Sequence, residues 1–370
     1  MRYNWQQNDW PQFTYDLSGF SSQLSLFSEK VGKIKGLLEG LTEGVQLETI
    51  VEAMVSEAIN TSSIEGEFLS RVDVMSSIKN NLGLNANLVS VKDQRAKGIG
   101  QMVAHIRSTF NDPLNNDYLF DLHKMLMLGN KVINTGVWRS SEEPMRVVSG
   151  TIGRETIHYE APPSKNIPSE MKRFLQWFNE TAPSQKNSIQ EVPVRSAVAH
   201  VYFESIHPFE DGNGRIGRAI SEKAIYQGIG SPIPISLSKA IEVDKSAYYQ
   251  ALQVAQRSNE ITPWLHYFVD TILHAQEVSE KEILFTLKKT KFFDRVKSHI
   301  NTRQEKVLRK MLAVGPDGFQ GGMNAKKYRS IAKTSKATAT RDLQALVALG
   351  IFIPIGGGRS TRYDLSLIHI

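Results

Sequence analysis

Apolar residues recur every three or four positions along most of this chain, which is the spacing of helices with one buried face. Helices are therefore predicted over five segments: Val31–Leu41, Leu47–Ser63, Pro113–Leu128, Val194–Ile206 and Arg215–Gln227. Two short apolar runs, Met145–Val148 and Thr156–Tyr159, flank Ser149–Gly153 and predict a β-hairpin. The pattern predicts a mainly α fold with a small amount of strand.

The C-terminal part has a different order of elements. After a hydrophilic linker expected over Glu277–Lys291, partly helical, three short helices and then two strands are predicted. These elements are Gln304–Ala313, Ala325–Thr334, Thr338–Leu349, Ile351–Ile353 and Arg362–Leu365. Three helices followed by a glycine-rich hairpin form the order of a winged helix-turn-helix, an α+β domain.

The C-terminal part also differs from the rest of the chain in net charge. Residues 281–370 contain 18 Lys and Arg against 6 Asp and Glu, whereas the other residues carry a net charge of −6. The third helix presents plausible groove-facing side chains: Thr338, Thr340, Arg341 and Gln344. Arg359 and Arg362 in the hairpin could contact phosphates. Winged helices also dock proteins, so the basic domain predicts either DNA binding or protein docking.

Composition limits the classes of protein. The 370 residues are 41% hydrophobic and 22% charged, as in a soluble protein of two or three domains. Cysteine is absent, which excludes disulfides, thiolate metal sites and a cysteine nucleophile. Met1–Trp10 is polar, and no run of about 18 apolar residues occurs. We therefore expect a cytoplasmic protein without a signal peptide or membrane span.

The densest group of reactive side chains lies between His207 and Arg218. Gly212 and Gly214 permit a tight turn at the start of the helix that follows. Unpaired backbone N–H groups at such a helix start attract anions. Arg215 and Arg218 are three positions apart, so they project from one helix face and can bind several phosphates.

Other residues of this run could provide a base and a metal ligand. Asn213 tolerates a left-handed backbone and offers an amide donor. Asp211 is a hard oxygen ligand, and Mg²⁺ bound to phosphates takes one or two such carboxylates. His207 precedes Pro208, which ends the preceding helix, and its neutral imidazole can accept a proton from a hydroxyl. Each residue alone also fits a structural role, but together they predict a triphosphate site.

The same run fills every fixed position of a known signature: His-Pro-Phe, any residue, Asp or Glu, Gly-Asn-Gly-Arg, two free positions, Arg. It resembles the signature of the Fic family, whose members mostly transfer AMP from ATP onto protein side chains. The resemblance implies a helical Fic core with a short β-hairpin flap, and the use of ATP and Mg²⁺. Gly214 stands where a phosphorylating relative has Lys, so the resemblance favours AMP transfer.

The resemblance also implies roles for single residues. His207 would be the general base, Asp211 would hold Mg²⁺, and Arg218 would pair with the γ-phosphate. Arg215 would contact the phosphates as well. The α- and β-phosphates would be held by Gly212, Asn213 and Gly214.

A second motif lies before the core. It consists of Ser or Thr, three free positions, Glu, and Gly or Asn, and it is filled by Thr61, Glu65 and Gly66. In Fic proteins this glutamate enters the ATP site and forms a salt bridge with the second signature arginine, here Arg218. The resemblance therefore implies a chain inhibited by its own N-terminal segment. Some members also use this glutamate to remove AMP from targets, so that reverse activity is an alternative.

Two further groups of residues are implied by the resemblance. The flap would supply contacts near ATP and the target from Ile157, His158, Tyr159 and Glu160. Paired tyrosines line the adenine pocket in relatives, so this role is carried over to Tyr248, Tyr249 and Gln256. Without the resemblance, the hairpin would be a surface element and the tyrosines would be core residues.

We expect three domains: residues 1–105 with the inhibitory motif, residues 106–285 as the Fic core, and residues 286–370 as the winged helix. The expected partner is a target protein with an acceptor Tyr, Thr or Ser hydroxyl. Dimers are common in the family, so a second copy of the chain is a further expected partner. The opposing hypothesis is a DNA-binding regulator whose core senses nucleotides. His207 argues for chemistry, because sensing ATP needs no base.

Overall fold

The structure is a computed structural model that describes residues 2–150, 156–313, 318–357 and 361–366. The helices of the N-terminal half are α1 (Ser21–Glu39), α2 (Glu43–Ile64), α3 (Arg71–Asn81), α4 (Gln94–Ser108), α5 (Asn116–Leu126) and α6 (Ile167–Glu180). They are followed by α7 (Val192–Ile206), α8 (Asn213–Ile229), α9 (Leu237–Val243), α10 (Lys245–Ala255), α11 (Thr262–Val296), α12 (Thr302–Leu312), α13 (Ala325–Ala332) and α14 (Lys336–Ala348). The remaining elements are the 3₁₀ turns η1 (Asn4–Gln6) and η2 (Ser164–Asn166) and the strands β1 (Arg146–Ser149), β2 (Thr156–Glu160), β3 (Phe352–Ile355) and β4 (Arg362–Leu365).

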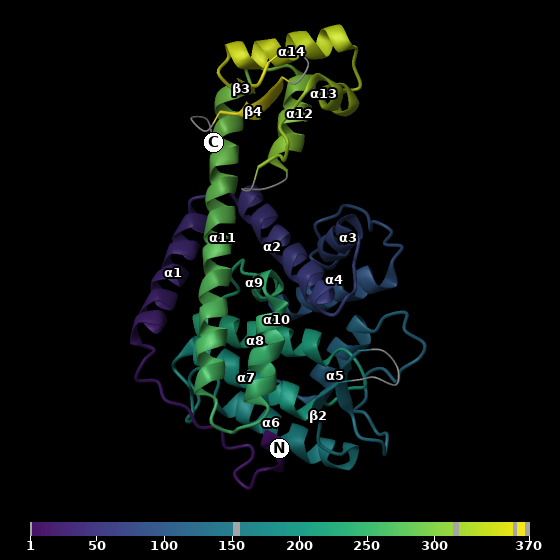
Figure 1. The fold of residues 1–370 in the computed structure, drawn as a ribbon, viewed down its shortest axis with the longest axis vertical. Helices are drawn as coiled ribbons and strands as arrows, with labels where there is room; N and C mark the ends of the chain where they lie inside the picture. Colours follow the sequence, from purple (N-terminus) through teal and green to yellow (C-terminus); the bar gives the residue numbers. More distant parts are fainter. Residues whose placement is uncertain (1, 151–155, 314–317, 358–360, 367–370) are drawn as a thin grey trace. The chain divides into compact units, whose positions relative to one another are not determined.

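The prediction of a mainly α fold with short strand pairs is confirmed (Figure 1). The chain forms two compact units, Met1–Gly36 with Gln46–Ser279 and Leu37–Val45 with Glu280–Ile370. Among the residues described, no helix is both long and apolar enough to cross a membrane.

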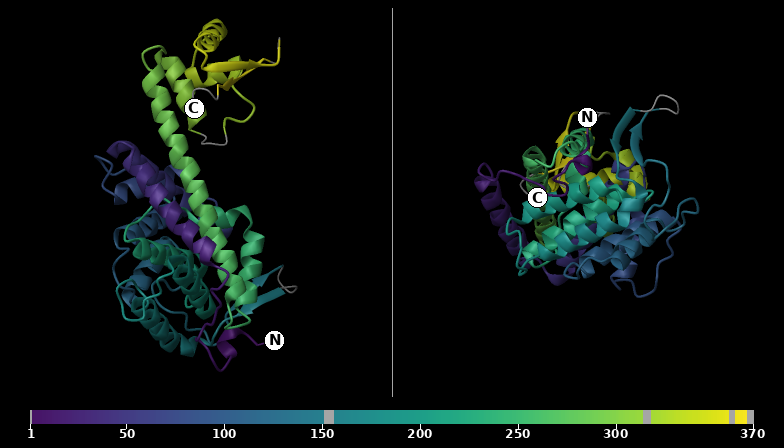
Figure 2. Two further views of the ribbon diagram at one scale, coloured as in Figure 1. Left: turned by 90° about the vertical axis from the view of Figure 1, so that its left-hand side faces the viewer. Right: turned by 90° about the horizontal axis from the view of Figure 1, so that it is seen from below.

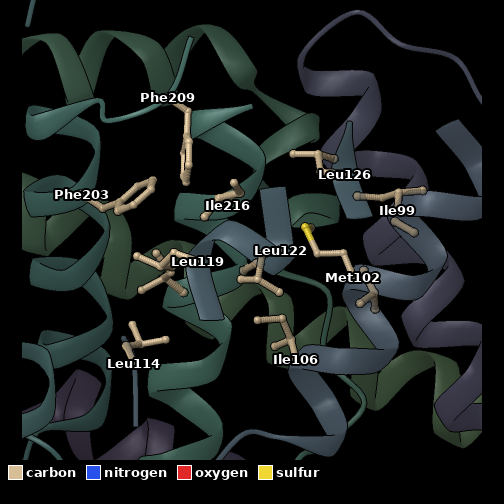
Figure 3. Close-up of a cluster of buried hydrophobic side chains, with 14 of the residues drawn as sticks. Ile99, Met102, Ile106, Leu114, Leu119, Leu122, Leu126, Phe203, Phe209 and Ile216 are labelled. Carbon is tan, nitrogen blue, oxygen red and sulfur yellow. The ribbon is translucent and has the colours of Figure 1, made fainter. Parts of the chain in front are cut away.

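Helix α7 lies at the centre of the first unit. All of its residues from Pro193 to Ile206 are buried, and a helix buried on every side belongs in the interior of a protein. Figure 3 shows Phe203 from α7 and Phe209 from the loop after it converging with Leu119 of α5. The loop between α7 and α8 is therefore fixed against a packed core.

The strands β1 and β2 form an antiparallel hairpin with a bulge between Val147 and Val148. Both views of Figure 2 show this hairpin extending out from the helices of its unit. The stretch from Thr151 to Gly153, predicted as part of its connection, lies outside the described residues.

The second unit has a core of its own, in which Leu308 of α12, Tyr328 of α13, Leu343 of α14 and Phe352 of β3 are buried. Helix α13 is joined to α14 through Lys333, whose φ of 48° lies in the left-handed region. A three-residue turn between two short helices is typical of a helix-turn-helix.

Two element predictions were wrong. Helix α1 begins at Ser21 and not at Val31. Its first turns are mostly polar, so the helical spacing of its buried apolar residues, which include Phe27 and Ile34, is not evident from the sequence. Helix α11 continues without a break through Glu277–Lys291, where a linker that is only partly helical was expected. Hydrophilic composition therefore marked a mostly half-buried helix rather than a change in secondary structure.

Candidate active site

The loop after α7 turns sharply at two residues. His207 ends the helix in a left-handed conformation with φ 51°, and its N–H donates to the Phe203 carbonyl at 2.9 Å. Gly212 reverses the chain again with φ 83°, and a β-carbon there would collide with Met127. Helix α8 begins immediately after it, at Asn213. Local sequence and close packing thus aim the start of α8 back toward His207.

The side chain of Asn213 has a structural use that the sequence did not predict. Its amide nitrogen donates to the Phe209 carbonyl, and its amide oxygen accepts from the Phe209 N–H, each at 2.9 Å. The amide was predicted as a donor, and one of its two N–H groups is used in this bond to the Phe209 carbonyl. Asn213 is also the first residue of α8, so its backbone N–H lies at the helix start.

The end of α2 follows the pattern of a helix closed by glycine. Gly66 has a φ of 79°, and its N–H donates to the Ser63 carbonyl at 2.9 Å. The N–H of Glu67 donates to the Ser62 carbonyl, also at 2.9 Å. These two bonds define a Schellman motif, which requires a left-handed residue at the position of Gly66. The turn brings the carboxylates of Glu65 and Glu67 to the start of α8.

Arg218 is enclosed by this segment of α2. Its Nε donates to Thr61 Oγ1 at 2.9 Å, and its Nη2 donates to the Thr61 carbonyl at 2.9 Å and to Glu65 Oε1 at 2.8 Å. The arginine is fully buried, whereas 29% of the Glu65 side chain is exposed. A β-carbon at Gly214 would collide with the Glu65 carboxylate, so that carboxylate covers the first turn of α8.

Arg215 has a carboxylate partner of its own. Its Nη1 donates to Glu67 Oε2 at 2.8 Å, and its Nη2 lies 3.5 Å from Asp211 Oδ1. Glu67 had no predicted role. Two guanidinium nitrogens, Arg215 Nε and Arg218 Nη1, are buried without a hydrogen-bond partner among the described residues. Buried cationic donors beside a helix start suit an anion.

His207 is held in its neutral form. Burial, and after it the charge of Arg139, lower the pKa of His207 to about 4. Glu204 Oε2 lies 3.7 Å from His207 Nδ1, beyond hydrogen-bond reach. Burial, together with repulsion from Glu65, raises the pKa of Glu204 to about 8, so this neighbour is largely protonated at pH 7. A neutral imidazole can accept a proton.

A cavity of about 720 Å³ lies beside these residues. Its lining includes His207 and Gly214 from the signature, Glu65 from the inhibitory motif, and five of the residues predicted to surround ATP. These five are His158, Tyr159, Tyr248, Tyr249 and Gln256. A space of this size suits a nucleotide-sized ligand.

Several of these lining side chains are already bonded. Tyr159 donates to the Ser205 carbonyl at 2.5 Å, and the Tyr248 hydroxyl lies 2.8 Å from His200 Nε2. Tyr249 is 42% exposed and donates to the Ile64 carbonyl at 3.3 Å. Tyr249 thereby joins α10 to the end of α2.

Gln256 lines the cavity but is already bonded, whereas Ile157 and Glu160 lie outside the lining. The side chain of Gln256 donates to the Glu204 carbonyl at 3.1 Å. Ile157 is 44% exposed on the hairpin, and Glu160 pairs with Arg146 at 2.8 Å. Neither Ile157 nor Glu160 belongs to the cavity lining, which runs through the two residues between them.

Asp211 is the predicted Mg²⁺ ligand. Its side chain is 54% exposed and accepts the Gly212 N–H at 2.6 Å. Among the described residues, no three His, Cys, Asp or Glu side chains gather into a metal site. A Mg²⁺ ion that is also bound to phosphates needs only one or two carboxylates, so the donor set fits such an ion.

The predicted groove-facing residues of α14 divide into two pairs. Arg341 and Gln344 are exposed, whereas Thr338 and Thr340 are half-buried. Thr338 lies 3.0 Å from the capping Ser335 hydroxyl, and Thr340 donates to the Lys336 carbonyl. Arg362 is exposed on β4, and Arg359 lies outside the described residues.

Sequence reasoning missed three residues with close contacts to the site. Glu204 could have been found, because it lies three positions before His207 on the same helix. Glu67 follows the inhibitory motif directly, but only the turn at Gly66 reveals its direction. The stretch Gly136–Arg139 resembles one in many Fic relatives, but no pattern connected Arg139 to His207; its side chain donates to the His207 carbonyl at 2.7 Å.

Comparison with known proteins confirms the family resemblance. Residues 113–225 match the Fic/DOC family, and residues 3–84 match a domain of unknown function, DUF4172. A protein adenylyltransferase Fic of Culex quinquefasciatus is 25% identical over 223 residues, 59% of this chain and 40% of that protein. A Fido domain-containing protein of Dictyostelium discoideum is 34% identical over 94 residues, 25% of this chain and 60% of that protein.

A solved structure extends the likeness to the fold. A Fic family protein from Desulfovibrio desulfuricans G20 is similar with a TM-score of 0.53 and 17% identity, over 96% of this chain and 98% of that one. The chain therefore shares its fold with a Fic family protein. It spans only about two fifths of the length of the Culex relative.

Proposed function

Because the chain carries a Fic/DOC family domain over residues 113–225, we propose that it is an ATP-dependent protein adenylyltransferase. The observation that carries the proposal is a largely buried, neutral His207, whose side chain is 13% exposed, on the same cavity as the start of α8. The adenylyltransferase relatives support the choice of reaction. The substrates would be ATP and a protein side chain with a hydroxyl group.

The reaction follows from the chemistry of these groups. His207 would accept the proton of the target hydroxyl while its oxygen attacks the α-phosphorus. The new oxygen–phosphorus bond forms as the bond to the bridging oxygen breaks, and pyrophosphate leaves. The α8 N-terminus, Arg215 and Arg218 would stabilise the negative charge of the phosphates. Asp211 would hold Mg²⁺, which supplies further charge neutralisation when bound.

We further propose that the described conformation is inhibited. Glu65 bonds Arg218 and covers Gly214, so the γ-phosphate partner and part of the anion site are both blocked. Glu67 bonds Arg215 in the same way. Two carboxylates from one turn would therefore withhold both arginines from ATP. Release of that turn would restore the site.

Labelled ATP tests the reaction type. We expect the Glu65→Gly variant to incorporate label from the α-phosphate of ATP into protein and none from the γ-phosphate. Mass spectrometry of a lysate treated with this variant would identify the modified residue. Label from the γ-phosphate would instead indicate phosphate transfer and contradict the proposal.

A second candidate activity is DNA binding by the C-terminal unit. The exposed face of α14 carries Lys336, Arg341 and Gln344, while its one acid, Asp342, is buried and paired with Arg303. An uncompensated basic helix after a short turn suits the major groove of DNA. This basic surface favours the phosphates of DNA over a protein partner with few acidic residues.

Salt dependence tests this candidate. We expect duplex DNA to bind with an affinity that falls as salt rises, because each phosphate contact releases counterions. Arg341→Ala should weaken binding and lower the slope of log affinity against log salt by about 1. Lys310→Ala, which removes a charge from the exposed side of α12, is the control. Equal effects of both variants in fluorescence anisotropy would rule out α14 as the reading helix.

A further inference from the structure

Arg139 lies in the segment between α5 and β1 and is 4% exposed. Its backbone N–H donates to the Pro208 carbonyl at 2.9 Å. Its side chain donates to the His207 carbonyl at 2.7 Å and to the Ile206 carbonyl at 3.4 Å. One residue thus bonds the carbonyl groups of three successive positions, with His207 in the middle.

The same guanidinium reaches the segment that follows the hairpin. It donates to the Pro162 carbonyl at 2.5 Å and to Ser164 Oγ at 2.9 Å. Pro162 comes two positions after the end of β2, the strand that lines the cavity through His158 and Tyr159. Arg139 therefore connects the backbone at His207 to the base of the hairpin.

These bonds meet a local structural need. The last carbonyls of a helix lack partners inside it, and α7 ends in the interior of the protein. A left-handed conformation is also uncommon for a residue other than glycine, and it persists where the surroundings fix it. Arg139 supplies donors at that point, so it restrains the backbone from which the His207 ring projects.

Arg139 also contributes a charge. Burial lowers its pKa to about 10, which leaves it positive at pH 7. The charges that face His207 are Arg139 from this segment, Glu65 after α2, Asp211 in the loop, and the ionisable Glu204 on α7. Arg139 is the one that opposes protonation of the imidazole, in addition to burial.

We propose that Arg139 is the positioning residue for His207: it fixes the left-handed turn that aims the imidazole and maintains the imidazole in the form that accepts a proton. The inference rests on the proposed function of His207 as the general base. Arg139 itself does not line the cavity, so it acts on the reaction through His207.

The test compares Arg139→Gln and Arg139→Lys, both in the Glu65→Gly background. Arg139→Gln should lower kcat by about 10- to 100-fold with little change in KM for ATP, because a small displacement of a catalytic group is costly. It should also move the acidic limb of the pH profile upward by about one pH unit, since a positive charge near His207 is lost. Arg139→Lys retains the positive charge, so the acidic limb of its pH profile should not move, while its kcat should fall.

Arg195→Gln is the matched control. Arg195 is another buried arginine that donates to a backbone carbonyl, that of Phe178 at 2.8 Å, and burial lowers its pKa to about 10 as well. Its loss should lower thermal stability without moving the acidic limb. If Arg139→Gln behaves in the same way as Arg195→Gln, Arg139 is only a structural residue and the inference is wrong.

An NMR titration of His207, assigned by comparison with His207→Ala, separates this inference from the proposed function. A rise in the pKa of His207 in Arg139→Gln supports the inference even if no AMP transfer is found. An unchanged pKa and an unchanged ring environment in both Arg139 variants would overturn it even if the Glu65→Gly protein transfers AMP.

Discussion

Replacing Glu65 with glycine is expected to raise the rate of AMP transfer by about 10- to 100-fold, which is the usual range of coupling between an inhibitory contact and a site. The substitution removes the carboxylate that accepts from Arg218 Nη2 at 2.8 Å. It also clears the space above Gly214. The measurement is incorporation of label from the α-phosphate of ATP, together with ATP affinity by calorimetry.

Two further variants serve as a comparison and a control for Glu65→Gly. Glu67→Gln should produce a smaller increase, because it frees Arg215 and leaves the Glu65 contact in place. Glu52→Ala removes a carboxylate from the same helix that pairs with Arg71 at the surface, so it should have no effect. Equal transfer by the wild type and Glu65→Gly at saturating ATP would exclude autoinhibition by this residue.

Replacing His207 with alanine in the Glu65→Gly background is expected to lower transfer by about 100- to 10,000-fold, the range typical of a lost general base. ATP binding should be retained, because the phosphate contacts come from α8. His274→Ala on α11, where the ring is 46% exposed, serves as the control. Retained transfer without the imidazole would refute its role as the base.

The pH dependence of AMP transfer by the Glu65→Gly variant provides a second test of His207. Its pKa is lowered to about 4, so the ring is neutral throughout the range from pH 5 to 8. The rate should therefore remain level on the acidic side and decline only as pH falls through about 4, when the base becomes protonated. A limb near the ordinary histidine value of about 6.5 would show that the ring is more exposed in the active state.

The sequence by itself determined the local features of the site. A tight turn was predicted at Gly212 and Gly214: Gly212 has a positive φ, a conformation that side chains strain, whereas Gly214 lies in the first turn of α8. The spacing of Arg215 and Arg218 placed them on one helix face beside the turn. The helical periodicity of apolar residues also determined the fold class. Such features depend on residues within about one helical turn of each other, which is the range over which sequence patterns are informative.

Only the tertiary structure decided which groups meet. Glu67 and Arg215 are 148 positions apart, and Arg139 and His207 are 68 positions apart, so no spacing rule connects them. The amide of Asn213 was predicted to serve a ligand, but packing of the loop brought it to the Phe209 backbone. Burial, which neutralises His207 and Glu204, is likewise produced by distant segments. Which side chains pair and which are desolvated depends on the packing of whole helices. No short stretch of the chain determines that packing.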